Sequence, residues 1–206
     1  GKHQQNLGYA TSSDGIRWEK PVLGKIEFAG SRQNNLVLTG TVGTVFEDPT
    51  GFANARYKFA ARKEGLSLYG SSDGIDWKPV FDRPLLKKGH FDTQNQIFWD
   101  RRIRKYVAYM RRWEPLRKVG RSETPDLASW PEPSIVFSYD SRDPVESDHY
   151  NSCVLQYPYA PNVYERAAAN YAWCNRQLLM MQAREAFARI FGRPWQEMQM
   201  NLVYDV

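Results

Sequence analysis

Short apolar runs separated by turn-forming residues recur through the first three quarters of the chain. Val45-Phe-Glu-Asp48 precedes Arg56-Tyr-Lys-Phe-Ala-Ala61, and the same arrangement returns as Ile97-Phe-Trp-Asp100 before Lys105-Tyr-Val-Ala-Tyr-Met110. The aspartate that ends each first run is predicted to form a turn. Regularly spaced short strands with turn signals predict an all-β array.

A second repeat follows the strands. Tyr9-Ala-Thr-Ser-Ser-Asp-Gly-Ile-Arg-Trp18 returns as Leu68-Tyr-Gly-Ser-Ser-Asp-Gly-Ile-Asp-Trp77, and a looser copy spans 121–130. Asp14 and Asp73 are predicted to accept backbone N–H bonds, with a glycine next in line to adopt positive φ. A catalytic role for these aspartates is disfavoured, because one active site does not need three equivalent copies. Repeats of about 50 to 60 residues with about four strands suit β-propeller blades, although they are slightly longer than the common blade repeat.

The C-terminal stretch has a different pattern. Residues 165–191 contain neither Pro nor Gly and are rich in Ala, Arg, Gln, Leu and Met, and Gly192 and Pro194 follow. That pattern predicts a helix, with one mostly apolar stripe that serves as a packing face. The chain is therefore predicted to divide into a β domain over residues 1–164 and a helical segment over residues 165–206.

Composition excludes several classes of protein. The 206 residues are 14% aromatic, which argues against a disordered or collagen-like chain. A mean hydropathy of -0.64 and the lack of a long apolar run predict no membrane span and no membrane partner. No signal peptide is visible. Cys153 and Cys174 have no CxxC spacing, and the three histidines lack metal-ligand spacing, so neither a metal nor a cofactor is predicted.

The formal charge of +5 is concentrated in one stretch. A cluster of this kind attracts nucleic acid or acidic polysaccharide. The plainer interpretation is a solvated hairpin edge, where charge discourages edge-to-edge pairing. The residues are Arg101, Arg102, Arg104, Lys105, Arg111, Arg112, Arg117 and Lys118.

The repeat and its surroundings resemble the five-bladed β-propeller glycosidases, glycoside hydrolase families 32, 43, 62 and 68, and bacterial proteins similar to the family 32 N-terminal domain. The resemblance covers about residues 8–164. The segments that carry it are Ser13-Asp-Gly-Ile-Arg-Trp-Glu-Lys-Pro21, Asn34-Asn35, Arg56-Tyr-Lys58, Phe91-Asp-Thr-Gln-Asn95, Lys105-Tyr-Val-Ala-Tyr109 and Asp148-His-Tyr150. The resemblance implies about three of the five blades, as expected either of a truncated chain or of a reduced variant whose open edges are covered by the helix or by self-association.

The resemblance implies hydrolysis of oligo- or polysaccharides by paired carboxylates. Asp92, just before a first strand and without an acidic equivalent in the preceding unit, is the leading catalytic candidate. Asp148 or Glu146 is the candidate general acid, with a pKa raised by burial or a neighbouring carboxylate. Each acid has the alternative of a loop residue. The predicted sugar-binding residues are Asn34, Asn35, His90, Asn95, His149 and Tyr150.

Two rival functions stay open at this stage. One is a non-catalytic propeller that binds carbohydrate or protein. The other is binding of an acidic polymer by the hairpin from Arg101 to Lys118, with affinity that falls steeply with salt. The leading prediction has a saccharide substrate and no nucleic acid, and a secreted or periplasmic location fits the family.

Overall fold

The computed structural model describes residues 5–92, 94–113, 117–143, 147–149, 153–157, 159–160, 162–167 and 170–172. Within these ranges the protein is all-β apart from one 3-10 turn, η1 (Phe52–Asn54). Two sheets have four strands each. The first contains β3 (Val42–Glu47), β4 (Tyr57–Lys63), β5 (Gly65–Ser71) and β6 (Lys78–Pro79), and the second contains β7 (Gln96–Asp100), β8 (Lys105–Trp113), β9 (Arg117–Thr124) and β10 (Ser134–Phe137).

Three strand pairs complete the described fold. They are β1 (Asn6–Gly8) with β2 (Leu36–Thr39), β12 (Cys153–Gln156) with β13 (Tyr164–Ala167), and β11 (Ser147–His149) with β14 (Asn170–Ala172). All pairings are antiparallel, and each four-stranded sheet is a meander in chain order.

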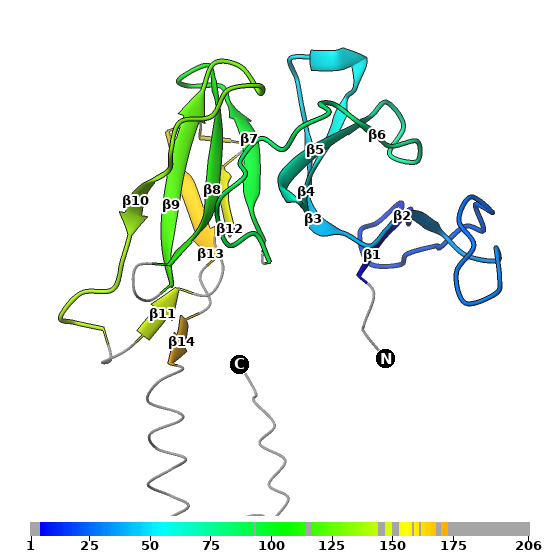
Figure 1. The fold of residues 1–206 in the computed structure, drawn as a ribbon, viewed down its shortest axis with the longest axis horizontal. Coiled ribbons are helices and arrows are strands. Elements are labelled where there is room, and N and C mark those ends of the chain that lie inside the picture. The colour runs from blue at the N-terminus through cyan, green and yellow to red at the C-terminus, as the bar shows by residue number, and fades with distance from the viewer. Residues whose placement is uncertain are drawn as a thin grey trace, which may run out of the picture.

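The sheets follow one another around an arc (Figure 1). The first strands of successive units are neighbours, since β3 contacts β7 and β7 contacts β12. None of the sheets in the described part of the chain closes on itself. The all-β prediction is confirmed, and the finer propeller assignment is taken up below.

The side chains of strand β8 pack against the units on both sides of its sheet. Tyr106, Ala108 and Met110 point to the core shared with the first four-stranded sheet, where Phe46, Leu66 and Leu68 lie. Val107 and Tyr109 point to the opposite face and pack with Val154 of β12. Because side chains alternate along a strand, apolar residues at every position bury both faces of this sheet. A third cluster joins the first sheet to the β1–β2 pair.

The three Asp-x-x-x-Trp segments form the predicted turns. Asp14 accepts backbone N–H bonds from Ile16 and Arg17, both at 2.8 Å, and these bonds lower the pKa of its carboxyl group. Gly15 has a φ of 74°. Each tryptophan donates its indole N–H to a backbone carbonyl of its own turn, at 3.2, 2.9 and 3.0 Å in the three copies. The structural role of these aspartates is confirmed.

The predicted helix over residues 165–191 is wrong at its start. Tyr164–Ala167 pairs with Cys153–Gln156, and Asn170–Ala172 pairs with Ser147–His149. Pairing with strands that precede it in the chain overrides the local helix preference of this segment. Residues 173–206, which hold the rest of the predicted helix, lie outside the described residues.

Among the helices that the structure describes, none has the length and apolar character needed to cross a membrane.

Candidate functional site

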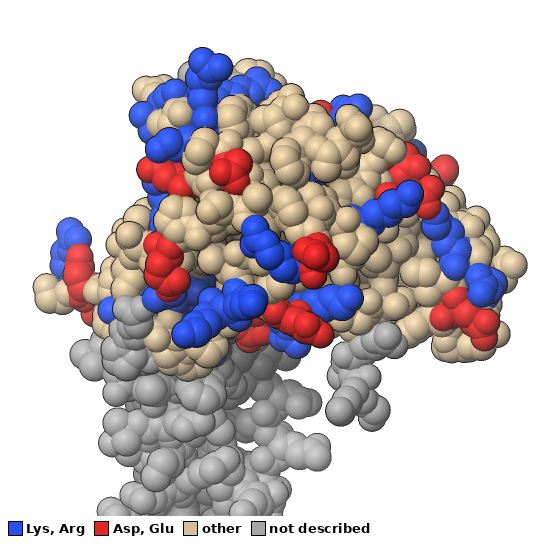
Figure 2. Space-filling model, turned by 45° about the horizontal axis from the view of Figure 1, so that its top comes forward, with Lys and Arg blue, Asp and Glu red and all other residues tan. Residues whose placement is uncertain are grey.

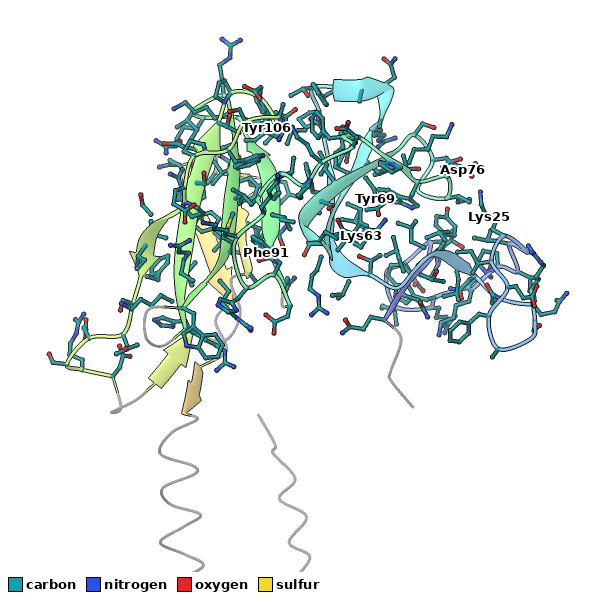
Figure 3. All side chains as sticks on the ribbon, in the orientation of Figure 1. Lys25, Lys63, Tyr69, Asp76, Phe91 and Tyr106 are labelled. Atoms are coloured by element: carbon teal, nitrogen blue, oxygen red, sulfur yellow. The ribbon has the colours of Figure 1, made fainter. Side chains whose placement is uncertain are left out.

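Asp92 lies in a shallow hollow of about 280 Å³ between the β4–β5 turn and the segment before β7. The hollow carries more positive than negative charge, because Arg62, Lys63 and Lys87 also line it. Asp92 accepts a hydrogen bond from the buried guanidinium of Arg111 at 2.8 Å. Figure 3 labels Lys63 and Phe91, two of the residues that line this hollow. The catalytic assignment of Asp92 stays a prediction.

The neighbours predicted to bind substrate with Asp92 are held by the fold. Asn95 is buried, and its amide donates to the carbonyl of Phe91 at 3.2 Å, which ties the segment down before β7 begins. The ring of His90 lies 5.3 Å from that of Trp113, centroid to centroid. His90 lines the same hollow as Asp92, whereas Asn95 does not.

Asn34 and Asn35 belong to a different part of the molecule, just before β2. The Asn34 amide donates to the carbonyls of Ile26 at 2.9 Å and Ser31 at 3.1 Å. The Asn35 amide donates to the carbonyl of Tyr9 at 2.6 Å. Both amides therefore fasten the long loop between β1 and β2, and the assignment of these two residues to a binding site stays a prediction.

The second predicted acidic cluster is described only in part. Asp148 lies in β11, opposite Tyr171 of β14, and β11 contacts β9. His149 is buried. Glu146 and Tyr150 lie outside the described residues.

Asp48 and Asp100 form turns, as predicted, and each also reaches the next unit. The carboxylate of Asp48 accepts the backbone N–H of Thr50 at 3.0 Å and the hydroxyl of Tyr106 at 3.0 Å. It also pairs with Lys58 at 3.0 Å, and both side chains are fully buried. The Lys58 ammonium donates to the carbonyls of Phe52 and Ala55. We call this set of contacts the first junction.

Burial raises the pKa of Tyr106 to about 12, and the adjacent Asp48 carboxylate acts in the same direction. The Tyr106 hydroxyl also lies 2.5 Å from the Thr50 hydroxyl. Figure 3 labels Tyr106 at the upper end of the second sheet, where the first junction is formed.

The second junction repeats this arrangement around Asp100. Its buried carboxylate accepts the backbone N–H of Arg102 at 2.9 Å and the hydroxyl of Tyr164 at 2.5 Å. The amide of Gln156 donates to it at 3.3 Å. The Arg102 guanidinium donates to the Tyr164 hydroxyl at 3.2 Å, and this contact raises the pKa of Arg102 above its ordinary value. Like any arginine, Arg102 is charged at physiological pH.

A pocket of about 640 Å³ opens beside the second junction. We call it the β7–β12 pocket. Its walls combine aromatic rings, arginines and amides, a mixture that suits a ligand with both a flat ring and a negative charge. The lining residues are Gln96, Phe98 and Trp99 of β7, Arg101 and Arg102 of the following turn, and Leu155, Gln156 and Tyr157 at the end of β12.

Sequence reasoning did not find this pocket, although part of its signal was visible. Asp100-Arg101-Arg102 occupies the place of Asp48-Pro49-Thr50 in the repeat. Two arginines at positions that are otherwise uncharged mark a change of role within the repeat. The partners on β12 come from more than 50 residues further along the chain, so only the fold brings them to the arginines.

A metal site has no support in the residues that the structure describes, because they contain no cluster of three or more His, Cys, Asp or Glu side chains able to hold an ion. Cys153 is a free, partly buried thiol in β12.

The C-terminal end of this chain is similar in sequence to known proteins. Residues 159–206 match the family tRNA-splicing ligase RtcB. The tRNA-splicing ligase RtcB of Thermococcus kodakarensis is 49% identical over 41 residues, 20% of this chain and 8% of the relative. That of Archaeoglobus fulgidus is 50% identical over 40 residues, 19% of this chain and 8% of the relative. No solved structure matches.

The chain thus spans about 8% of the length of these curated relatives. The matched segment begins at Tyr159, between β12 and β13. It includes β13 and β14, and it continues into residues 173–206, beyond the described part of the chain.

These matches overturn the resemblance to glycoside hydrolases. The family found is a ligase family of tRNA splicing. The predicted glycosidase activity, the carbohydrate-binding alternative and the saccharide substrate are therefore wrong. The prediction that nucleic acid is not a partner is wrong for the same reason. Residues 159–206 of this chain are similar to tRNA-splicing ligase RtcB.

Proposed function

We propose that this chain binds RNA and contributes to an RNA-joining enzyme. The observation that carries the proposal is the similarity of residues 159–206 to tRNA-splicing ligase RtcB, with 49% identity over 41 residues in the Thermococcus kodakarensis protein. RNA binding is the activity we assign to the chain itself. Joining of RNA ends is assigned to the enzyme in which it takes part.

The charge of the molecule supports this assignment. The formal charge is +5, and Figure 2 shows Lys and Arg gathered at the upper left, over the end of the second sheet. The turn between β7 and β8 contributes exposed Arg101 and Arg102 to this end. Cations arranged in this way attract a phosphate backbone over a distance of about 8 to 10 Å at ordinary ionic strength.

The proposal includes the architecture in which these residues stand. The described strands form blades of a propeller, about three of a possible five, and a second part of the chain follows β14, since β13 and β14 pair with strands of the blades. Two observations support blades: the meander order of both four-stranded sheets, and the repeated Asp–Tyr contact between successive units. Limited proteolysis of the intact chain tests the division, because cleavage is expected to concentrate between the two parts.

RNA binding is tested by fluorescence anisotropy with a labelled tRNA half and, separately, a labelled heparin oligosaccharide of similar charge. We expect the RNA to bind at least tenfold more tightly, with an affinity that declines linearly on a logarithmic salt scale. Equal affinity for the two polyanions, or no RNA binding at low salt, contradicts the proposal.

A further inference from the structure

The β7–β12 pocket is the feature of the molecule that best suits a defined ligand. Its volume of about 640 Å³ lies within the range of small-molecule sites, roughly 300 to 1,000 Å³. Three of its lining side chains are aromatic and two are arginines. The hollow around Asp92 is smaller, at about 280 Å³, and carries no aromatic wall beyond Phe91 and His90.

The charge at the pocket is fixed and exposed. Arg101 and Arg102 are both exposed to solvent at its rim. The acid nearest to them along the chain, Asp100, is fully buried and occupied by the bonds of the second junction. The Nε–H of Arg102 is used by the Tyr164 hydroxyl, so Arg101 and the terminal amino groups of Arg102 are the donors offered to an anion. An arginine binds phosphate oxygens through paired N–H donors.

The aromatic side of the pocket includes an exposed ring. Tyr157 is 37% exposed, and its ring lies 5.7 Å from that of Tyr159, which is 88% exposed. The backbone of Tyr157 is held by two hydrogen bonds, from its N–H to Val163 at 2.9 Å and from Ala160 to its carbonyl at 3.3 Å. An exposed ring carried by an ordered backbone beside a pocket is a stacking surface for a base.

We propose that the β7–β12 pocket binds one unpaired nucleotide of a single-stranded RNA. Its base stacks on Tyr157, and its phosphate is held by Arg101 and Arg102. This inference rests on the proposed RNA-binding function and adds the site and the single-stranded form of the ligand. A base in a duplex is already paired and stacked within the helix, so it does not enter a pocket of this kind.

The test uses the full chain and a fluorescein-labelled single-stranded RNA, with its duplex and free nucleoside monophosphates as comparison ligands. The variants are Arg101→Gln and Tyr157→Ala, and the matched control is Arg104→Gln. Arg104 is exposed in the same turn and carries the same charge, but it does not line the pocket. The control thus removes equal charge from the same surface. Thermal unfolding of each variant checks that the fold is intact.

We expect the single strand to bind at least tenfold more tightly than the duplex. Arg101→Gln is expected to weaken binding about tenfold and Tyr157→Ala about five- to tenfold, with Arg104→Gln below about twofold. Free monophosphates that compete as well as the RNA strand would overturn the single-strand assignment.

A second measurement needs no substitution. Ultraviolet crosslinking of the bound RNA, followed by mass spectrometry, is expected to mark the peptide that contains Tyr157. If the unmodified chain binds RNA but crosslinks fall elsewhere and all three variants bind equally, the pocket assignment fails while RNA binding stands. If the unmodified chain does not bind RNA, the proposed function fails as well.

Discussion

The two junctions between successive units use one motif in two environments. At the first junction, Asp48 receives the Tyr106 hydroxyl and pairs with Lys58, and no part of either charged side chain is exposed. At the second junction, Asp100 receives the Tyr164 hydroxyl, and the arginine that touches this tyrosine lies at the surface. The first junction is sealed, whereas the second stands at the edge of an open pocket.

Two positions of the repeat account for this difference. Lys58 follows the tyrosine of β4, and Val107 occupies the same place in β8, so the buried ammonium of the first junction has no equivalent in the second. The residue two positions after the aspartate also differs. In the first junction it is Thr50, which contacts the Tyr106 hydroxyl, and in the second it is Arg102, which contacts the Tyr164 hydroxyl. A repeated geometry can thus hold sheets together at one junction and present positive charge at the next.

Among the substitutions that test the two junctions, Lys58→Met is expected to lower the free energy of unfolding most. The substitution leaves the Asp48 carboxylate buried without its cation, a loss of roughly 3 to 5 kcal/mol in the free energy of unfolding. Denaturant unfolding followed by tryptophan fluorescence measures it. The control is Lys105→Met, whose side chain is 43% exposed and 3.9 Å from Glu123, and we expect a loss below about 0.5 kcal/mol. Equal losses in the two variants would show that the first junction is not sealed.

The second largest effect is expected from alkaline pH, which should weaken the first junction. The pKa of Tyr106 is raised to about 12, whereas an unfolded tyrosine titrates near 10. The folded protein keeps its proton where the unfolded chain loses it, so this stability is complete below pH 10 and is lost as the pH rises toward 12. The loss is about 2 kcal/mol. Unfolding curves between pH 9 and 12 measure it, and Tyr106→Phe should flatten that slope. An unchanged slope in Tyr106→Phe assigns the effect to other groups.

The smallest effect on stability is expected for Arg102→Thr. This substitution gives the second junction a threonine at the position that Thr50 occupies in the first. Threonine can meet the Tyr164 hydroxyl as Thr50 meets that of Tyr106, so stability should change by less than about 0.5 kcal/mol. RNA affinity should fall about three- to tenfold, because one of the two pocket arginines is removed. Denaturant unfolding and anisotropy on the same samples separate the two effects. A large loss of stability would mean that Arg102 holds the fold rather than the ligand.

Local chemistry was enough to predict the turns and most strands. In the Ser-x-Asp-Gly segments, the aspartate, the glycine and the tryptophan all act within a few residues, as at Asp14, Gly15 and Trp18. Their conformation depends on neighbours that the sequence displays directly. The strands of the four-stranded sheets follow for a similar reason, since hairpin partners are adjacent in the chain and the apolar alternation marks them.

The helix predicted from residue 165 shows where such reasoning fails. Its local pattern is helical, but Tyr164–Ala167 and Asn170–Ala172 pair with strands from earlier in the chain. The predicted family was also wrong, because the repeat of residues 9–130 has the pattern of propeller blades, whereas the similarity to RtcB lies in residues 159–206.

The sequence by itself determined the all-β character, the repeat and the aspartate turns, because each depends on contacts between residues close together in the chain. Only the tertiary structure decided what Asp48 and Asp100 hold beyond their own turns, because their tyrosine partners lie 58 and 64 residues further along. The β7–β12 pocket also depends on the tertiary structure. Arg101 and Arg102 form a binding surface only because the fold brings Tyr157 to the same pocket. The packing of distant segments determines this arrangement, and the local sequence pattern does not show it.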